Sequence, residues 1–272
     1  MVVEPEEGFL DVGGYKIHFL KWGTDGPKLV FIHSMGMDAR GFDITSRALS
    51  GEYQILALDI LDHGDSESPK EPVSLPEHAD IMRKAYMKMG FKPNVLVGHS
   101  VGGMMGMVLA ADHPKDFNGM VLVDIAPFTM SGEGRSNQPR PQPVNEYESL
   151  EEARAYFKER YGDFVDEAVE NRLQYGLIKG DDGIYRRKPT GDAIRGGLST
   201  DLWPYVERMK GPIFLMKGGT SNLVTPETLN RMKRLLRDLQ VATFDGVGHM
   251  IPQGKPEEFE RHLRNYLNSL NL

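Results

Sequence analysis

A serine between two glycines lies between a short apolar run, residues 95–97, and a longer apolar segment, residues 103–111. The five residues of this pattern are Gly98, His99, Ser100, Val101 and Gly102. The pattern G-x-S-x-G is common in loops, but between a strand and a helix it forms a sharp turn that lifts the serine hydroxyl above a sheet. The N-terminus of the following helix favours an anion beside that hydroxyl. Ser100 is therefore the candidate nucleophile.

A serine hydroxyl becomes a good nucleophile only when a base takes its proton, and the base needs a carboxylate to fix its tautomer. Of the eight histidines, His249 is the candidate base because it lies in the glycine-rich stretch 246–250, between the last apolar run and a C-terminal helical segment. Loops at the carboxyl ends of parallel strands build the sites of open α/β sheets. His99 is too close to Ser100 in sequence to act as its base and is expected to pack or to orient its surroundings locally. His33 is expected to shape a loop.

The elements that must position these residues can be predicted from periodicity. Short apolar runs without alternation are typical of strands buried on both faces of a parallel sheet. They are residues 29–32, 55–58, 95–97, 120–123, 213–216 and 241–244. A glycine pair at 13–14 between 8–12 and 15–22 predicts a hairpin. Apolar residues at helical spacing predict helices over 75–89 and 226–239 and from residue 256 onward.

Strands that alternate with helices indicate an α/β fold with a doubly wound, mostly parallel sheet. Residues 128–200 interrupt this alternation, first with a Gly- and Pro-rich loop over 131–143 and then with helical segments over 148–161 and 165–177. About 70 residues with weak helices form a marginal domain alone. We therefore expect 1–127 and 201–272 to form one core and 128–200 to form a helical lid over the strand ends.

Composition excludes several classes of function. The chain has 272 residues and a net charge of −7, which disfavours nucleic acid as a partner. It has no cysteine, so disulfides and thiolate ligands are excluded, and no H-E-x-x-H spacing indicates a metal site. Its N-terminus is acidic and lacks a signal-peptide core, and no apolar run reaches the length of a membrane span. We expect a cytoplasmic protein that needs no cofactor, and the sequence leaves the oligomeric state open.

Four segments together resemble the α/β-hydrolase fold family across nearly the whole chain: residues 33–36, 59–66, 98–103 and 248–250. The resemblance implies Ser100 as nucleophile and His249 as base. It also implies an oxyanion hole made by the backbone N–H groups of Val101 and Met35. This chain departs from the family at Ser34 and Asp62, where glycine is common.

The acid has two candidate positions. Most members of the family carry it after the strand expected at 213–216, but Ser221 stands there in this chain, and the nearby Glu227 is expected in the first turn of a helix. Asp124 follows the run 120–123 instead. That segment resembles esterases of the same fold whose acid lies after this earlier strand. The resemblance therefore implies Asp124 as the acid, with Glu227 as the alternative.

Serine, histidine and an oxyanion hole together perform acyl transfer. The resemblance implies a carboxylesterase-type serine hydrolase that cleaves small-molecule esters of small or medium acyl chains through an acyl-enzyme intermediate. The alternative enzyme is a C–C bond hydrolase of ring-cleavage products, although that class keeps the acid missing at position 221. A ligand receptor without catalysis on a hydrolase scaffold is the alternative from a different class. The intact pair Ser100 and His249 disfavours it.

Overall fold

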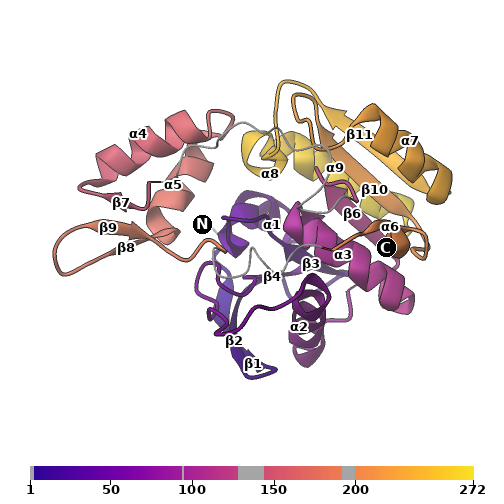
Figure 1. Cartoon of the computed structure of the whole chain (residues 1–272), viewed down its shortest axis with the longest axis horizontal. Helices are drawn as coiled ribbons and strands as arrows, with labels where there is room; N and C mark the ends of the chain where they lie inside the picture. Colours follow the sequence, from indigo (N-terminus) through magenta and orange to yellow (C-terminus); the bar gives the residue numbers. More distant parts are fainter. Residues whose placement is uncertain (1–2, 94, 128–143, 192–199) are drawn as a thin grey trace.

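The computed structural model describes residues 3–93, 95–127, 144–191 and 200–272. An eight-stranded sheet forms its centre, in the order β1-β2-β4-β3-β5-β6-β10-β11 (Figure 1). Its strands are β1 (Glu6–Val12), β2 (Tyr15–Trp22), β3 (Lys28–Ile32), β4 (Gln54–Leu58), β5 (Val95–His99), β6 (Gly119–Val123), β10 (Ile213–Gly218) and β11 (Leu239–Phe244). All six apolar runs lie in these strands, so the predicted α/β sheet is confirmed.

The sheet is antiparallel at one edge and parallel elsewhere. β1 and β2 form the predicted hairpin, in which Val12 pairs with Tyr15 across Gly13 and Gly14. Both glycines have positive φ, as a two-residue hairpin turn that matches the twist of the strands requires. β2 is also antiparallel to β4, and every later neighbour is parallel. The carboxyl ends of β3, β4, β5, β6 and β10 therefore meet along one edge.

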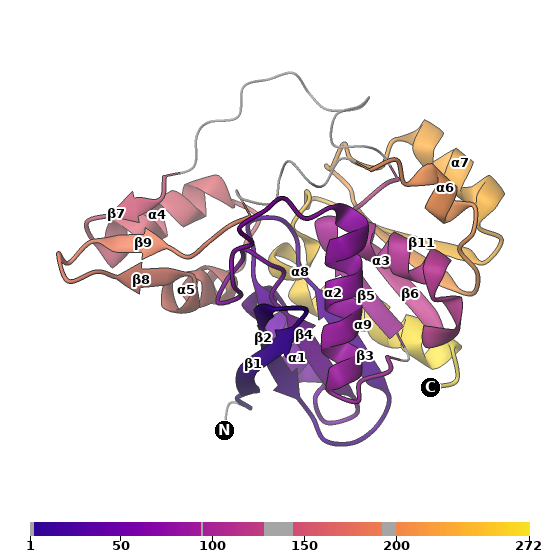
Figure 2. The same ribbon diagram turned by 60° about the horizontal axis from the view of Figure 1, so that its bottom comes forward.

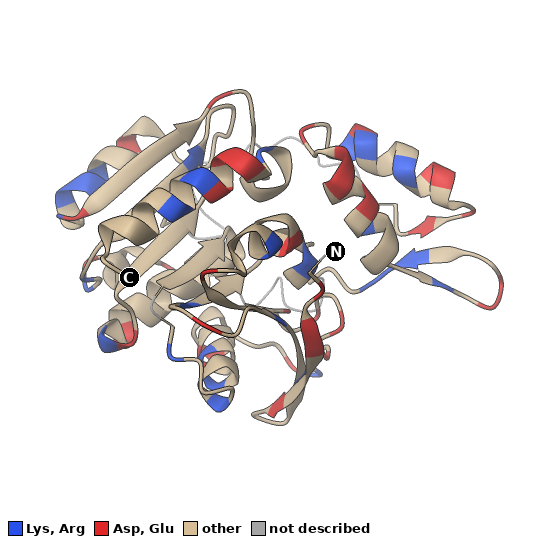
Figure 3. Ribbon diagram, turned by 180° about the vertical axis from the view of Figure 1, so that it is seen from behind, with Lys and Arg blue, Asp and Glu red and all other residues tan. Residues whose placement is uncertain are grey.

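Helices cover both faces of the sheet, which explains why the apolar runs of its central strands β3, β4, β5 and β6 are buried on both sides. In β3, Val30 and Ile32 belong to the core on one face, whereas Leu29 and Phe31 belong to the core on the other. The first core lies under α2 (Leu75–Lys88), α3 (Val101–Asp112), α6 (Trp203–Val206) and α7 (Pro226–Leu235). The second lies under α1 (Asp43–Leu49), α8 (Ile251–Gly254) and α9 (Pro256–Ser269). Residues of both charge signs are interspersed along the outer helices (Figure 3).

The helices predicted from sequence periodicity are present in the structure, with small differences in their ends, whereas the short helices were not predicted. α7 ends at Leu235 rather than at 239, because Leu236 is extended and buried and the chain then enters β11. α1, α6 and α8 were not predicted, since four to seven residues are too few for a clear helical period. No helix within the described ranges is long and apolar enough to cross a bilayer.

Residues 144–191, between β6 and α6, lie beside the central sheet (Figure 2). They contain α4 (Leu150–Arg160) and α5 (Asp166–Tyr175), which match the two predicted helices. They also contain a three-stranded sheet of β7 (Glu146–Tyr147), β9 (Tyr185–Arg187) and β8 (Leu177–Lys179), which sequence analysis missed because strands this short show no period. Buried residues from these elements form their own apolar cluster. The predicted loop over 131–143 lies outside the described residues.

Candidate active site

Ser100 occupies a strained turn between β5 and α3. Its φ of 52° and ψ of −114° are sparsely populated for a residue with a side chain and cost about 1–3 kcal/mol. The turn is held by the Ser100 N–H, which donates to the Val123 carbonyl over 3.0 Å. A Cβ at Gly98 would lie 2.5 Å from the Gly102 oxygen, and one at Gly102 would lie 2.2 Å from the Ile32 oxygen. Both glycines are therefore required for the tight turn.

Asp124 and His249 meet at the carboxyl edge of the sheet. Asp124 directly follows β6 and its side chain is fully buried, while the His249 side chain, which follows β11, is 32% exposed. His249 Nδ1 lies 2.8 Å from Asp124 Oδ2. This hydrogen bond fixes the imidazole ring and leaves Nε2 as the nitrogen that can take a proton. The geometry is that of a carboxylate orienting a base.

Two further donors fix the Asp124 carboxylate. The Gly218 N–H, at the end of β10, donates to Oδ1 over 2.9 Å, and the Ser221 hydroxyl donates to Oδ2 over 2.5 Å. β6 and β10 are adjacent parallel strands, so their ends present both segments to the same imidazole. Position 221 therefore contributes a hydrogen bond to the carboxylate instead of the carboxylate itself. Glu227 is exposed in the first turn of α7, and the side-chain partner of His249 Nδ1 is Asp124.

The loop after β3 lies beside the start of α3, because the Gly102 N–H donates to the His33 carbonyl over 3.2 Å. Residues 34–37 form a turn in which the Met37 N–H donates to the Ser34 carbonyl over 3.1 Å, and Gly36 has a positive φ. Within the described ranges, neither the Met35 N–H nor the Val101 N–H donates to a protein acceptor. Two unpaired N–H groups, one in this loop and one at the start of α3, are what an oxyanion hole requires.

Two buried neutral histidines hold this loop. The Ile60 N–H donates to His33 Nε2 and the Gly36 N–H donates to His63 Nε2, so each Nε2 is an acceptor and each Nδ1 carries the proton. These Nδ1 groups donate to the carbonyls of Ser34 and Leu61. Burial lowers the pKa of His33, and burial together with His33 lowers the pKa of His63 to about 3. Both rings therefore stay neutral and keep the tautomer that the loop needs.

His99 links the turn around Ser100 to the loop that carries His249. It is fully buried, and its Nε2 donates to the His249 carbonyl over 2.8 Å. Its ring centroid lies 4.8 Å from that of His249. Burial, and then His249, keep the pKa of His99 well below its usual value. The role expected from the sequence, orienting its surroundings, is consistent with these contacts.

Asp62 and Ser34 show how the chain tolerates its departures from the family pattern. Asp62 replaces a common glycine and adopts the positive φ of 59° that glycine would favour. Ser34 replaces another glycine, and its hydroxyl is buried without a partner in the part of the chain that the structure describes. The adjacent loop nevertheless keeps its turn, because its backbone contacts to His33 and His63 do not depend on the side chain at 34.

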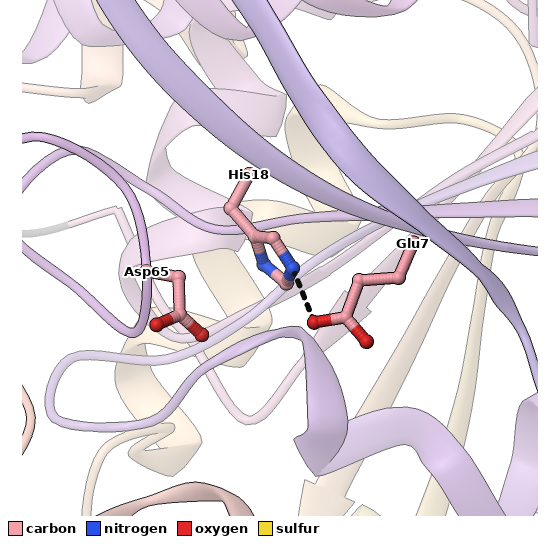
Figure 4. Close-up of side chains that lie close together, drawn as sticks. All are labelled: Glu7, His18 and Asp65. Atoms are coloured by element: carbon pink, nitrogen blue, oxygen red, sulfur yellow. Dashed lines mark hydrogen bonds and ion pairs between the residues drawn. The ribbon is translucent and has the colours of Figure 1, made fainter. Parts of the chain in front are cut away.

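A second polar cluster, Glu7, His18 and Asp65, has the residue types of a metal site (Figure 4). His18, however, is bonded on both sides, by Nδ1 to Asp59 over 2.8 Å and by Nε2 to Glu7 over 3.0 Å. Burial lowers the pKa of His18, but the hydrogen bond and charge of Asp59 outweigh it and raise the pKa overall. A metal ion at Nε2 would have to replace the hydrogen bond to Glu7. In the part of the chain that the structure describes, the contacts of His18 are those of an ion-pair network.

Taken together, the carboxyl edge of the sheet offers a strained serine, an oriented imidazole and two unpaired N–H groups. No hydrogen bond joins the Ser100 hydroxyl to His249 within the described ranges, which is common where catalytic contacts tighten only around substrate. Sequence reasoning missed the contributions of Ser221, Gly218 and His63. Ser221 was noted only as a missing carboxylate, and no local signal identified the other two.

Comparison with known proteins supports the same fold. The family model described as alpha/beta hydrolase fold matches residues 27–256. The 2-(acetamidomethylene)succinate hydrolase of Mesorhizobium japonicum is 24% identical over 263 residues, which cover 96% of this chain and 94% of that protein. The 3-hydroxybutyrate-oligomer hydrolase of Cupriavidus necator is 26% identical over 275 residues, covering 92% of this chain and 93% of that protein.

A solved structure shares the architecture as well. The crystal structure of E-2-(acetamidomethylene)succinate hydrolase aligns with a TM-score of 0.84 at 22% identity, over 97% of this chain and 99% of that one. Its likeness extends over the sheet and the insertion alike, because nearly all of both chains is covered. With most of its length matched by the family model, the chain belongs to the alpha/beta hydrolase fold family.

Proposed function

We propose that this hydrolase cleaves carboxylic esters of small or medium acyl chains through an acyl-enzyme intermediate. The observation that carries the proposal is the 2.8 Å contact between the buried Asp124 carboxylate and His249 Nδ1, at the sheet edge where Ser100 is held in a strained turn. A serine oriented for attack, with an imidazole held by a carboxylate, is the constellation of acyl transfer. The hydrolase names of the similar proteins support the reaction class.

In the first half of the reaction, Ser100 Oγ attacks the ester carbonyl carbon while its proton passes to His249 Nε2. The carbonyl oxygen becomes an oxyanion that accepts hydrogen bonds from the N–H groups of Met35 and Val101. Asp124 stabilises the imidazolium through Nδ1. His249 then gives its proton to the departing alkoxide, the C–O bond breaks and the acyl group remains on Ser100.

In the second half, water replaces the alcohol. His249 Nε2 takes a proton from the water molecule as its oxygen attacks the acyl carbon, and the second oxyanion occupies the same N–H pair. Collapse of this intermediate releases the carboxylic acid and returns the proton to Ser100 Oγ. Both half-reactions use His249 as the proton carrier, and the steps proposed here use no cofactor.

We also propose that residues 128–200 act as a lid that shapes the acyl pocket. Two contacts from its described part support this role. Asp163 Oδ2 accepts a hydrogen bond from the Gly248 N–H over 2.9 Å, and the Val165 N–H donates to the Gln253 carbonyl over 3.0 Å. The segment between α4 and α5 therefore lies against the loop that carries His249.

The test is the Ser100→Ala variant against the parent on p-nitrophenyl esters of increasing acyl length. Turnover should fall by about 10⁴-fold or more with the fold intact, and labelling by a fluorophosphonate should disappear. Ser269→Ala, at the exposed end of α9, is the matched control and should keep both activities. Ester turnover by Ser100→Ala within about tenfold of the parent would sink the assignment.

The ester assay and the labelling, together with a second assay on a vinylogous diketone, separate the alternatives. A parent protein that hydrolyses a vinylogous diketone but no ester would be a C–C bond hydrolase. A parent that binds small molecules without turning over any ester and without phosphonate labelling would be a receptor. Rapid turnover of short and medium esters, with labelling confined to Ser100, is the outcome expected here.

A further inference from the structure

Helix α5 attaches the insertion to the core mainly through polar side chains. Glu167 pairs with Arg47 of α1, and Asn171 lies 3.5 Å from Asp43. Tyr175 lies under the Arg40 guanidinium, whose carbon is 4.0 Å from the ring centroid. α5 lies on the side of the insertion nearer the core in both Figure 1 and Figure 2. The apolar cluster of the insertion packs separately, and these polar contacts contribute to how α5 sits on the core.

Arg172 is the buried member of this interface. It is 6% exposed, and its guanidinium reaches two residues of the loop after β3. One nitrogen lies 2.7 Å from Asp38 Oδ2 and another lies 2.5 Å from the Gly36 carbonyl oxygen. Asp38 is itself buried, so the two charges neutralise each other away from solvent. A planar guanidinium can hold a carboxylate and a carbonyl at once, which an ammonium group does less well.

These contacts hold the loop after β3, which contains the proposed oxyanion donor Met35, from a second side. The N–H of Gly36 is bonded to His63 on the core side, and its carbonyl is bonded to Arg172 on the insertion side. Gly36 directly follows Met35, whose N–H is a proposed oxyanion donor. With its glycine fixed from both sides, the loop has little freedom to move that N–H away from the position where charge develops.

The same segment of the insertion also reaches the base. Asp163 and Val165, just before α5, hold the loop around His249 through Gly248 and Gln253. Residues 163–172 therefore contact the loops that carry both the proposed base and the proposed oxyanion donor. The distance between these two loops is set partly by one short stretch of the insertion.

The space around Arg172 does not suit a substrate. Asp38, Asn171, Arg172 and Gln253 are among the residues that line a cavity of about 20 Å³, the room of about one water molecule. An acyl or alkyl group does not fit there. The guanidinium is already engaged by Asp38 and Gly36, so its contacts are directed at the loop.

We infer that Arg172 is a positioning residue for the oxyanion hole, an inference that rests on the proposed ester hydrolysis. It acts through Gly36 and Asp38 and does not touch the reacting atoms. Loss of its contacts should let the Met35 N–H drift from its position, and a displacement of about 1 Å in a catalytic group can cost about 10²-fold in rate. Substrate binding should change little, because oxyanion contacts form in the transition state.

The test compares Arg172→Met, Arg172→Lys and Asp38→Asn with the parent on p-nitrophenyl butyrate, with the folded fraction followed by circular dichroism. Arg172→Met should lower kcat by about 10²-fold with KM within about threefold, and Arg172→Lys by about tenfold because it keeps only one contact. Methylguanidinium should partly restore kcat in Arg172→Ala, in which the truncated side chain leaves room for it. Losses from Arg172→Met and Asp38→Asn should be non-additive in the double variant, since both break the same contact.

Arg154→Met is the matched control, because Arg154 forms an exposed ion pair with Glu170 between the two insertion helices. It should keep parental kcat and show no response to methylguanidinium. The inference is overturned if Arg172→Met stays folded with kcat within about threefold of the parent, if KM alone rises, or if kcat tracks the folded fraction in both Arg172 variants. Should Arg172→Met not fold, Arg172→Lys decides by the same criterion. Ester turnover retained by Ser100→Ala would instead refute the proposed function, so the two failures are distinguishable.

Discussion

Replacing Asp124 by asparagine exchanges one oxygen for an NH₂ group at a site where hydrogen bonds fix which atom goes where. The Gly218 N–H, 2.9 Å from Oδ1, requires an acceptor there, so the amide oxygen takes that position. The NH₂ group then takes the place of Oδ2, 2.8 Å from His249 Nδ1. It donates to Nδ1 and so drives the imidazole proton onto Nε2, the nitrogen that must accept the proton of Ser100.

We therefore expect Asp124→Asn to lower kcat for ester hydrolysis by ~10³ to 10⁴-fold, which corresponds to about 4–5.5 kcal/mol of transition-state stabilisation. KM should stay within about threefold, because the fully buried Asp124 cannot contact substrate. Initial rates on p-nitrophenyl esters give both constants. Fluorophosphonate labelling should slow in parallel, since it needs the same activated serine.

Two comparisons make this prediction sharp. Glu227→Gln should stay within about threefold of the parent, since Glu227 is exposed on α7. Adding Ser221→Asp to Asp124→Asn should recover at least about tenfold of the lost activity, because the Ser221 hydroxyl lies 2.5 Å from Asp124 Oδ2 and a carboxylate there can address the same imidazole. If Asp124→Asn left kcat nearly unchanged while Glu227→Gln lowered it strongly, the reasoning would be refuted. The acid would then be assigned to the segment after β10.

Gly102→Ala should lower the unfolding free energy, measured by urea titration, by about 3 kcal/mol or more. The reason is that a Cβ at Gly102 would lie 2.2 Å from the Ile32 oxygen. Gly51 has open space around it, so the unfolding free energy of Gly51→Ala should stay near that of the parent. An equal effect at both glycines would contradict the steric argument. The pKa of His18 is raised in the folded state. The contribution of His18 to the unfolding free energy should therefore be full below the unfolded pKa of 6.5 and should decline as pH rises through the folded pKa. His18→Gln should flatten that decline, and an unchanged pH profile would count against the network with Asp59.

The strained turn that carries Ser100, the proposed nucleophile, could be predicted from the sequence because its determinants are contiguous. Strand, turn and helix follow one another through Gly98, Ser100 and Gly102, and the steric need for glycine acts within five residues. The sheet could be predicted for a related reason. Strands buried on both faces are apolar throughout, and this composition is visible without knowing which strands pair.

The hydrogen-bond partners of the proposed catalytic residues depended on tertiary structure. Asp124 and Ser221 are 97 residues apart, and only the adjacency of β6 and β10 brings them together at His249. The contact between Gly36 and Arg172 spans 136 residues and depends on how α5 docks. Hydrophobic periodicity records which face of an element is buried, but carries no information about which loop ends face each other. That arrangement comes from strand order and packing. The sequence therefore determined the sheet and the turn that carries Ser100, whereas the hydrogen-bond partners of Asp124 and the contacts that hold the loop after β3 were decided by the fold.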